Sequence, residues 1–280
     1  SRLLTTAEIL SIYNNGKPND ISSLSPSYWW RLGENAYFQD TTLVLPNSVS
    51  GAPNAEAATS NLEMISVDAP GTYANGIGTN LDIIDRVGDA PLSTSNSQSY
   101  NMIPDDRHPY VPGYTPAMVD NAASMDFDGT NDYIITSTTP AQLGFPATTV
   151  SEGSFSISFW YNSTTHVNYA PIIWSATDYN LNDGFGVSQS TDFSSTKLRF
   201  WVGRYSFNRV YTDTGLNTGR WYHIVAVFTG GSTYTLQTYV DGVASGSATG
   251  TTSYNINSST GSVHIGYSGG SRNEYFNGSL

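Results

Sequence analysis

The second half of the chain consists of short runs in which apolar and polar residues alternate, separated by turn residues. Between residues 155 and 159, phenylalanine and isoleucine alternate with serine, so an extended strand there places its apolar side chains on one face. The pairs Asp128-Gly129 and Asp241-Gly242 provide the positive φ that tight hairpin turns require. Runs of this kind predict strands at 124–128, 132–136, 155–161, 172–175, 198–202, 222–228, 235–240 and 263–267. The pattern therefore predicts an all-β fold, an antiparallel β-sandwich whose sheets each bury one face.

A single short helix is expected near the N-terminus. Thr5 can cap it, and Glu8, three residues later, completes a capping box. Ile9 and Ile12 then share one face, and Gly16 stands where a left-handed residue ends a helix. After a polar connection, the aromatic-rich residues 27–32 predict a short strand.

Residues 46–121 form a long segment that is rich in Pro, Gly, Ser and Asn and shows no sustained periodicity. A structureless loop of this length is uncommon inside a compact domain. We therefore interpret the segment as an insertion that either wraps the sandwich with short strands or contacts neighbouring subunits.

The composition narrows the class of protein. Charged residues make up 12% of the 280 residues, which is about half the usual share. The net charge of −12 leaves no Lys/Arg stripe to neutralise phosphates, so nucleic acid is not expected as a partner. No run of 18 apolar residues occurs, and residues 1–10 lack a basic segment followed by an apolar one, so neither a membrane partner nor a secretory signal is predicted. Without cysteine, the fold depends on burial and backbone pairing.

One stretch of the chain is rich in side-chain oxygens, namely Asp126, Asp128, Asn131 and Asp132. Ca²⁺ takes about six to eight oxygen ligands from carboxylates, carbonyls and water, and it is the one cofactor that the sequence suggests. The alternative is an ordinary hairpin in which Asp128-Gly129 makes the turn and Asp126 points to solvent.

Exposed aromatic rings can stack on the apolar C–H faces of sugars. The candidates for such glycan binding are Tyr169, Trp174, Tyr179, Trp201 and Tyr205. The alternative is that the tryptophans at 160, 174, 201 and 221, which all sit in alternating strands, belong to the core.

Six stretches form a recognisable series: MDFDGTNDYI at 125–134, FSISFW at 155–160, RWYHIVA at 220–226, YVDG at 239–242, HIGY at 264–267 and FNGSL at 276–280. In this order and spacing they resemble the concanavalin A-like, laminin-G-type jelly roll. The resemblance implies two curved antiparallel sheets packed face to face over residues 122–280. It also implies a Ca²⁺ site at the sandwich rim, where relatives of this type often bind the ion.

In that family, the FNGSL stretch is followed by one more strand and then by a short helix that resembles residues 1–13. Here the helix stands at the front. The resemblance implies that residues 1–23 are the C-terminal helix and linker of a preceding repeat. Residues 24–280 would then be one jelly roll with the insertion at 46–121 and its last strand beyond residue 280. Circular permutation and exchange of the last strand between subunits are the alternatives.

Catalysis is not expected. Glycoside hydrolases on this fold place their carboxylates along one strand, about 5 Å apart across the glycosidic bond. The strands expected at 198–202 and 222–228 contain no acid, so a degenerate glycanase is only the third hypothesis. His223 and His264 lie among apolar strand residues and are interpreted as structural histidines.

The stretch LSPSYWWRLGE at 24–34, with the Ser/Asn-rich insertion behind it, resembles laminin-G-type modules in structural proteins of marine tailed phages. This resemblance implies a non-catalytic module at the virion surface, in a capsid-surface or fibre protein. Its partners would be other copies of itself, other virion proteins and host cell-surface glycans. The alternative is a secreted bacterial surface adhesin or extracellular filament subunit with glycan-binding modules of the same type.

Overall fold

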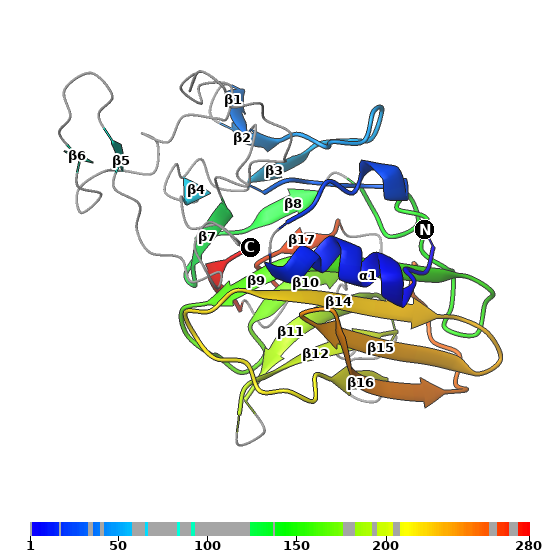
Figure 1. Ribbon diagram of the computed structural model, residues 1–280. Coiled ribbons are helices and arrows are strands. Elements are labelled where there is room, and N and C mark those ends of the chain that lie inside the picture. The colour runs from blue at the N-terminus through cyan, green and yellow to red at the C-terminus, as the bar shows by residue number, and fades with distance from the viewer. Residues whose placement is uncertain are drawn as a thin grey trace.

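Two antiparallel sheets pack face to face in the computed structural model of the protein (Figure 1). The structure describes residues 2–16, 18–32, 36–39, 42–57, 65–66, 83–84, 91–92, 124–136, 138–175, 183–191, 195–203, 208–257, 262–268 and 274–280. Within these residues, the expected all-β sandwich with one short helix is confirmed. The described helices are all too short or too polar to cross a bilayer.

The two sheets differ in size, and the chain passes repeatedly from one to the other. The larger sheet has the order β1 (Tyr37–Gln39), β2 (Thr42–Leu45), β3 (Ala55–Ala57), β8 (Ile134–Thr136), β17 (His264–Ile265), β10 (Pro171–Ser175), β11 (Phe185–Ser190), β12 (Lys197–Val202) and β13 (Arg209–Tyr211). The smaller sheet has the order β16 (Val243–Gly250), β15 (Tyr234–Val240), β14 (Tyr222–Thr229), β9 (Ser154–Ser163), β18 (Asn277–Ser279), β7 (Ser124–Asp128) and β4 (Ile65–Ser66). A separate hairpin joins β5 (Ile83–Ile84) to β6 (Pro91–Leu92).

All eight strands predicted in the second half of the chain are present, with ends that shift by two residues or fewer. The structure adds β11, β13, β16 and β18 to the same region. The prediction of a strand at residues 27–32 is wrong, because this segment forms no ladder and Trp30 makes only an isolated bridge to Asn47.

Part of the long insertion belongs to the sandwich itself. Within residues 46–121, β3 lies between β2 and β8 in the larger sheet, and β4 pairs with β7 at the edge of the smaller one. These short strands fit the expectation that the insertion wraps the sandwich. Most of its other residues lie outside the described ranges.

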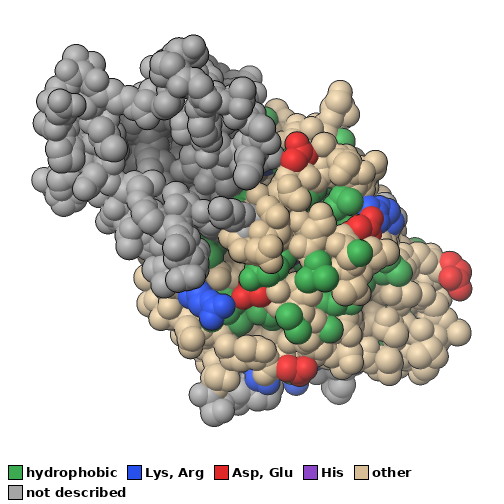
Figure 2. All heavy atoms as spheres, in the orientation of Figure 1, with side chains coloured by type: hydrophobic (Ala, Val, Ile, Leu, Met, Phe, Trp, Pro, Cys, Tyr) green, Lys and Arg blue, Asp and Glu red, His purple; other side chains and the backbone are tan. Residues whose placement is uncertain are grey.

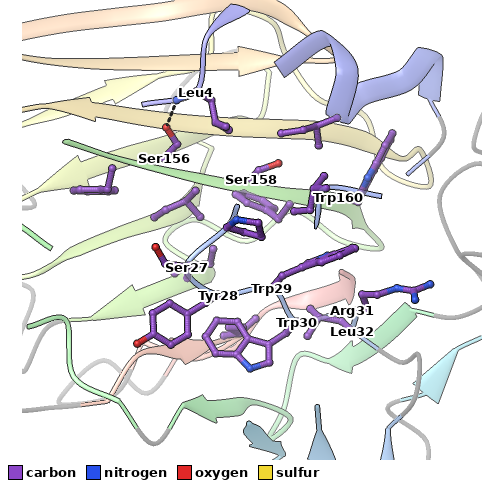
Figure 3. Close-up of a pocket in the computed structure, with 18 of the residues that line it drawn as sticks. Leu4, Ser27, Tyr28, Trp29, Trp30, Arg31, Leu32, Ser156, Ser158 and Trp160 are labelled. Carbon is purple, nitrogen blue, oxygen red and sulfur yellow. Dashed lines mark hydrogen bonds between the residues drawn. The ribbon is translucent and has the colours of Figure 1, made fainter. Parts of the chain in front are cut away.

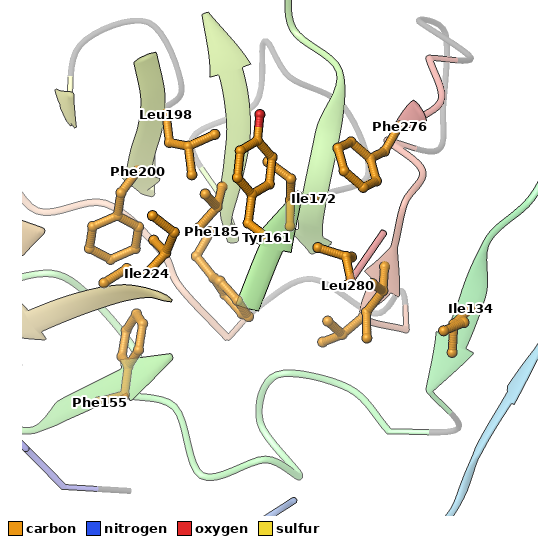
Figure 4. Close-up of a cluster of buried hydrophobic side chains, with 14 of the residues drawn as sticks. Ile134, Phe155, Tyr161, Ile172, Phe185, Leu198, Phe200, Ile224, Phe276 and Leu280 are labelled. Carbon is orange, nitrogen blue, oxygen red and sulfur yellow. The ribbon is translucent and has the colours of Figure 1, made fainter. Parts of the chain in front are cut away.

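The core fills the space between the sheets with the inward-facing side chains of both (Figure 4). In β9, Phe155 is buried and Ser158 is exposed, which confirms the predicted alternation. The Phe155 ring lies 5.2 Å from that of Phe228 in its own sheet and 5.6 Å from that of Phe185 in the opposite sheet. Aromatic contacts of this type therefore hold the two sheets together.

Helix α1 (Thr6–Tyr13) covers the outer face of the smaller sheet (Figure 1). The predicted capping box is present, since the Thr5 side chain accepts from the Glu8 amide and the Glu8 side chain accepts from the Thr5 amide. Ile9 is fully buried against Val225 and Val227 of β14. The helix ends two residues earlier than expected, at the left-handed Asn14, and short 3-10 turns follow at Asn14–Gly16 and Ser22–Leu24.

Candidate functional site

The oxygen-rich turn between β7 and β8 is held by its own hydrogen bonds. Asp128 Oδ1 accepts from the backbone amides of Thr130 and Asn131, at 2.6 and 3.2 Å. Asp132, which is buried, accepts from the Asp128 amide at 3.1 Å, and Asp126 accepts from Ser279 Oγ at 3.1 Å. Carboxylates that accept backbone N–H groups in this way define a turn. This is the role that the hairpin alternative assigned to Asp128.

The same geometry tests whether these residues fit a metal ion. Asp128 and Asp132 each already use one oxygen in a hydrogen bond within the turn, and Asp126 uses one in a hydrogen bond from Ser279 of β18. Among the described residues, no group of three or more His, Cys, Asp or Glu side chains could hold a metal ion. Calcium binding by Asp126, Asp128, Asn131 and Asp132 therefore stays a prediction. A fall in the melting temperature on chelation would support it, because a bound ion stabilises the folded state.

Beside this turn, three tyrosines and a histidine form a half-buried aromatic cluster that the sequence reasoning missed. The ring of Tyr267 lies 4.8 Å from those of Tyr133 and Tyr275, and it stacks on Tyr275 at 23°. His264 meets the Tyr133 ring edge-on, with 6.0 Å between their centroids. The pairing of β17 with β8 brings residues 133 and 264–267 together, although they are far apart in the chain.

The aromatic residues predicted to bind glycans do not form one exposed platform. Trp174 and Trp201 are 2% and 0% exposed and pack edge-to-face on the outer side of the larger sheet, 5.0 Å apart. Both rings are therefore buried, as the core alternative expected, although they form a small cluster of their own outside the main core. Tyr169 packs against this pair and is half-buried. Tyr179 and Tyr205 lie outside the described residues.

The other two tryptophans for which a core position was considered have different surroundings. Trp221 is 3% exposed, as the core alternative expected. Trp160 is half-buried on the outer face of β9, where Tyr13 of α1 stacks on it at 6.1 Å. The Trp160 ring therefore helps to hold the helix against the sheet.

A hydrogen bond joins the exposed Ser158 to the buried His223 beneath the end of α1. Ser158 Oγ is 2.8 Å from His223 Nε2, and the His223 ring is fully buried under Tyr13 and Trp160. The Asp241 carboxylate accepts from the backbone amide of His223 at 2.8 Å, while His223 Nδ1 has no hydrogen-bond partner. Burial lowers the pKa of His223 to about 3, so its imidazole is a very weak base at neutral pH. The arrangement is that of a structural histidine and lacks the geometry of a catalytic triad.

The buried His223 makes stability depend on pH. Between about pH 6.5 and pH 3 the unfolded chain binds a proton that the folded state excludes, so the free energy of unfolding falls as the pH drops. We expect the slope to approach about 1.4 kcal/mol per pH unit. Urea unfolding at intervals from pH 7 to pH 4 measures it. His223→Gln should flatten the dependence, whereas His264→Gln, at a half-buried position, should flatten it less; equal slopes in all three proteins would contradict this assignment.

A cavity of about 380 Å³ separates β9 from residues 24–32 (Figure 3). Ile157 and Phe159 of β9 line one side, and Tyr28, Trp30 and Leu32 line the other. All five side chains are partly buried and pack at the margin of the main core. The cavity is therefore a predominantly apolar gap in the wall of the sandwich.

Comparison with known proteins identifies a family model that matches this chain. The family model described as Laminin_G_3, of the concanavalin A-like lectin/glucanases superfamily, matches residues 128–280, more than half of the chain. No curated protein matches the sequence.

Two solved structures are similar at low identity. Domain 4 of the GH43 extracellular arabinanase AbnA from Geobacillus stearothermophilus, in complex with arabinotriose, is 16% identical over 57% of this chain and 72% of its own, with a TM-score of 0.38. The native heptameric SAP-like pentraxin from Limulus polyphemus is 20% identical over 56% of this chain and 72% of its own, with a TM-score of 0.37.

Proposed function

Because the chain belongs to the concanavalin A-like lectin/glucanases superfamily, we propose that it is a non-catalytic packing and attachment module of a surface assembly. The assembly that its sequence favours is a tailed-phage virion, in which it forms part of a capsid-surface or fibre protein with laminin-G-like repeats. Its partners are then other copies of itself or other virion proteins. A secreted bacterial surface adhesin or extracellular filament subunit is the alternative.

The observation that carries the packing role is an exposed apolar pair beside α1. Leu10 of the helix is 50% exposed, and Val243 at the start of β16 is 67% exposed. The tip of Leu10 lies against Gly242, the residue next to Val243. Figure 2 shows hydrophobic side chains among uncharged polar ones on this face, with few charges. A surface of this kind favours contact with another protein.

Replacing both exposed residues tests this role. We expect the 280-residue chain to associate as its concentration rises, and the double variant Leu10→Ser/Val243→Ser to associate at least about tenfold more weakly, because the apolar contact is lost. Sedimentation velocity over a range of concentrations measures this. Val167→Ser, at a residue that is also 48% exposed, is the matched control and should behave like the unmodified chain. Identical sedimentation of all three proteins at every concentration would rule out a packing role for this face.

The virion and the adhesin hypotheses predict different locations. An antibody raised against the purified chain should label phage particles in electron micrographs of a culture that produces the protein. Labelling confined to the bacterial cell surface would favour the adhesin and reject the virion assignment.

The hydrogen bonds of the acidic side chains support a non-catalytic role. Asp128 and Asp132 accept hydrogen bonds from backbone amides of their own turn, and Asp126 accepts one from Ser279 of β18. Ser158 bonds to a histidine that is buried beneath a helix. No release of reducing ends is expected when the protein is incubated with laminarin or agar. Reducing ends that vanish on mutation of Asp126 or Asp128 would overturn the assignment.

Glycan attachment is a second role, which the aromatic cluster of Tyr133, His264, Tyr267 and Tyr275 supports. Its rings are half-buried and lie at one place on the surface, so they can stack on a sugar ring. On a glycan array, we expect Tyr267→Ala to weaken binding about tenfold, since stacking contributes about 1 kcal/mol beyond the buried area. Tyr267→Phe keeps the ring and should retain binding. If the alanine variant binds as the unmodified chain does, the cluster is not the glycan site.

A further inference from the structure

The end of helix α1 covers a buried histidine of the smaller sheet. The ring of Tyr13 stacks on that of His223 at 19°, with 6.1 Å between their centroids. Trp160, directly opposite His223 on β9, places its ring 5.1 Å from the imidazole. Tyr13 Cβ lies 3.6 Å from the position that a Cβ on Gly242 would occupy, so the helix end also rests on the turn between β15 and β16. Beneath this cover, the His223 side chain is fully buried.

The hydrogen bonds around His223 suit an uncharged ring. Nε2 is 2.8 Å from Ser158 Oγ, and Nδ1 has no hydrogen-bond partner among the described residues. A protonated imidazole donates from both nitrogens. Its Nδ1–H group would then be buried without an acceptor, and this costs more for a charged ring than for a neutral one. The ring can therefore take up a proton only in a state in which water reaches it.

Few other titratable groups lie near this ring. In the described part of the chain they are Tyr13 from α1, Asp241 from the turn before β16, and Arg220 just before β14, whereas the β9 side chains that touch His223 are uncharged. Asp241 Oδ1 accepts from the His223 amide at 2.8 Å, and its Oδ2 pairs with Arg220 at 3.3 Å. The carboxylate is therefore bound to the main chain and to an arginine. Burial raises the pKa of Asp241, so a control for its titration is needed below.

The contacts that hold α1 can open without breaking a sheet. Ile9 packs on Val225 and Val227, and the Leu4 amide donates to Ser156 Oγ at 3.0 Å (Figure 3). These are contacts with side chains on the outer face, so the strand pairings are kept when they open. A helix of 8 residues is too short to persist in water by itself. Departure of α1 from the sheet therefore also unwinds it.

We propose that His223 is an acid-sensitive switch for α1, which stays docked on the smaller sheet at neutral pH and leaves it in acid while the sandwich remains folded. Acid favours the released state because water reaches Nδ1 only there. Release uncovers Val225, Val227 and Trp160, and so presents an apolar surface that the docked helix hides. The opening is local, so it precedes the global unfolding to which His223 also contributes. The inference is independent of the proposed function, since it depends on contacts within the chain.

The linkage between protonation and docking gives the size of the effect. Burial lowers the pKa of His223 to about 3 while α1 is docked, whereas a hydrated histidine has a pKa of about 6.5. Between pH 7 and pH 5 the released state binds a proton that the docked state excludes, so the equilibrium constant for release should rise about 20-fold. The amides of α1 report on release, because they lose bonds such as that from the Ile9 amide to the Thr5 carbonyl.

Hydrogen exchange of the 280-residue chain from pH 7 to pH 5, corrected for the intrinsic exchange rate at each pH, tests the switch. We expect the protection of the α1 amides to fall about 20-fold and to depend little on low concentrations of urea. Protection of the β14 amides should stay higher and fall steeply with urea, because global unfolding exposes more surface. The apolar dye 8-anilinonaphthalene-1-sulfonate should bind more strongly at pH 5 than at pH 7. Equal protection and equal urea dependence of α1 and β14 would overturn the inference, since α1 would then open only by global unfolding.

Two variants separate His223 from its acidic neighbour. His223→Gln keeps a hydrogen-bonding side chain but does not titrate, so its α1 protection should change less than about threefold between pH 7 and pH 5. Asp241→Asn keeps an acceptor oxygen for the His223 amide, and asparagine tolerates the φ of +51° at this position. This variant should retain the fall of about 20-fold. A full fall in His223→Gln, or its loss in Asp241→Asn, would assign the release to another group. If His223→Gln does not fold, Asp241→Asn and the comparison of α1 with β14 in the unmodified chain still decide between the outcomes.

Discussion

Truncation of Phe155 to alanine is expected to lower the free energy of unfolding by about 3–5 kcal/mol, the range found for deleting a fully buried aromatic side chain. Phe155 is 1% exposed and belongs to the smaller sheet. Its ring lies 4.3 Å from that of Phe145 and 5.6 Å from that of Phe185 in the larger sheet. The variant therefore loses contacts between the sheets as well as buried area, and it leaves a cavity that the surrounding strands cannot close.

Phe159→Ala is the matched control for this prediction. It removes the same side chain from the same strand and face, but Phe159 is only partly buried because it borders the gap beside residues 27–32. We expect its cost to be less than half that of Phe155→Ala, since less buried area is lost. Urea unfolding of both variants and of the unmodified chain measures the difference. Equal losses would mean that Phe155 does not join the two sheets more strongly than Phe159 does.

The strands that the sequence predicted are those whose own residues reveal their burial. In β9 the alternation of phenylalanine and isoleucine with serine is local information, and it located the strand correctly. Residues 185–190 show no such alternation, because Gly186, Ser188 and Ser190 occupy the outer face of β11 and are buried there. A Cβ on Gly186 would lie 2.8 Å from Trp201 Nε1, so the tryptophan of the next strand occupies that space. The sequence of β11 alone does not contain this reason.

The wrong prediction at residues 27–32 has a different physical origin. The composition of this segment is that of a strand, but a strand also requires a partner. Among the described residues, the segment forms no ladder and makes an isolated bridge between Trp30 and Asn47. The segment does have a high β-strand propensity. Whether it pairs, however, depends on parts of the fold that are distant in sequence.

The candidate site shows the same division between local and distant information. The turn made by Asp128 and Gly129 was predictable, because an Asp-Gly pair followed by Asn and Asp favours a local turn. The contact of Tyr133 with Tyr267 was not, because it depends on the antiparallel pairing of β8 with β17. The burial of Trp174 was likewise set by its contact with Trp201, which comes from a strand two positions away in the sheet.

The second large effect is expected from Gly278→Ala, in the FNGSL stretch. Gly278 is the central residue of β18 and lies between Phe127 of β7 and Ser163 of β9. Its φ is +145°, a conformation that residues with a side chain rarely adopt. A Cβ at this position would collide with the backbone oxygen of Asn162 and would lie 2.8 Å from the Cα of Ser163. Both obstacles are backbone atoms of a paired strand, so neither can move aside without breaking the β9–β18 pairing.

Gly278→Ala lowers the free energy of unfolding through both overpacking and backbone strain. Each of these costs about 1–3 kcal/mol, so we expect a total loss of about 2–6 kcal/mol. Gly219→Ala separates the two contributions. Gly219 also has a positive φ of +69°, but no atom lies within 4 Å of its Cβ position, so only the strain of about 1–2 kcal/mol applies. Urea unfolding compares the two variants. If they lose the same stability, the steric conflict at Gly278 is relieved by movement of β18, and the pairing of β18 with β9 is looser than the structure indicates.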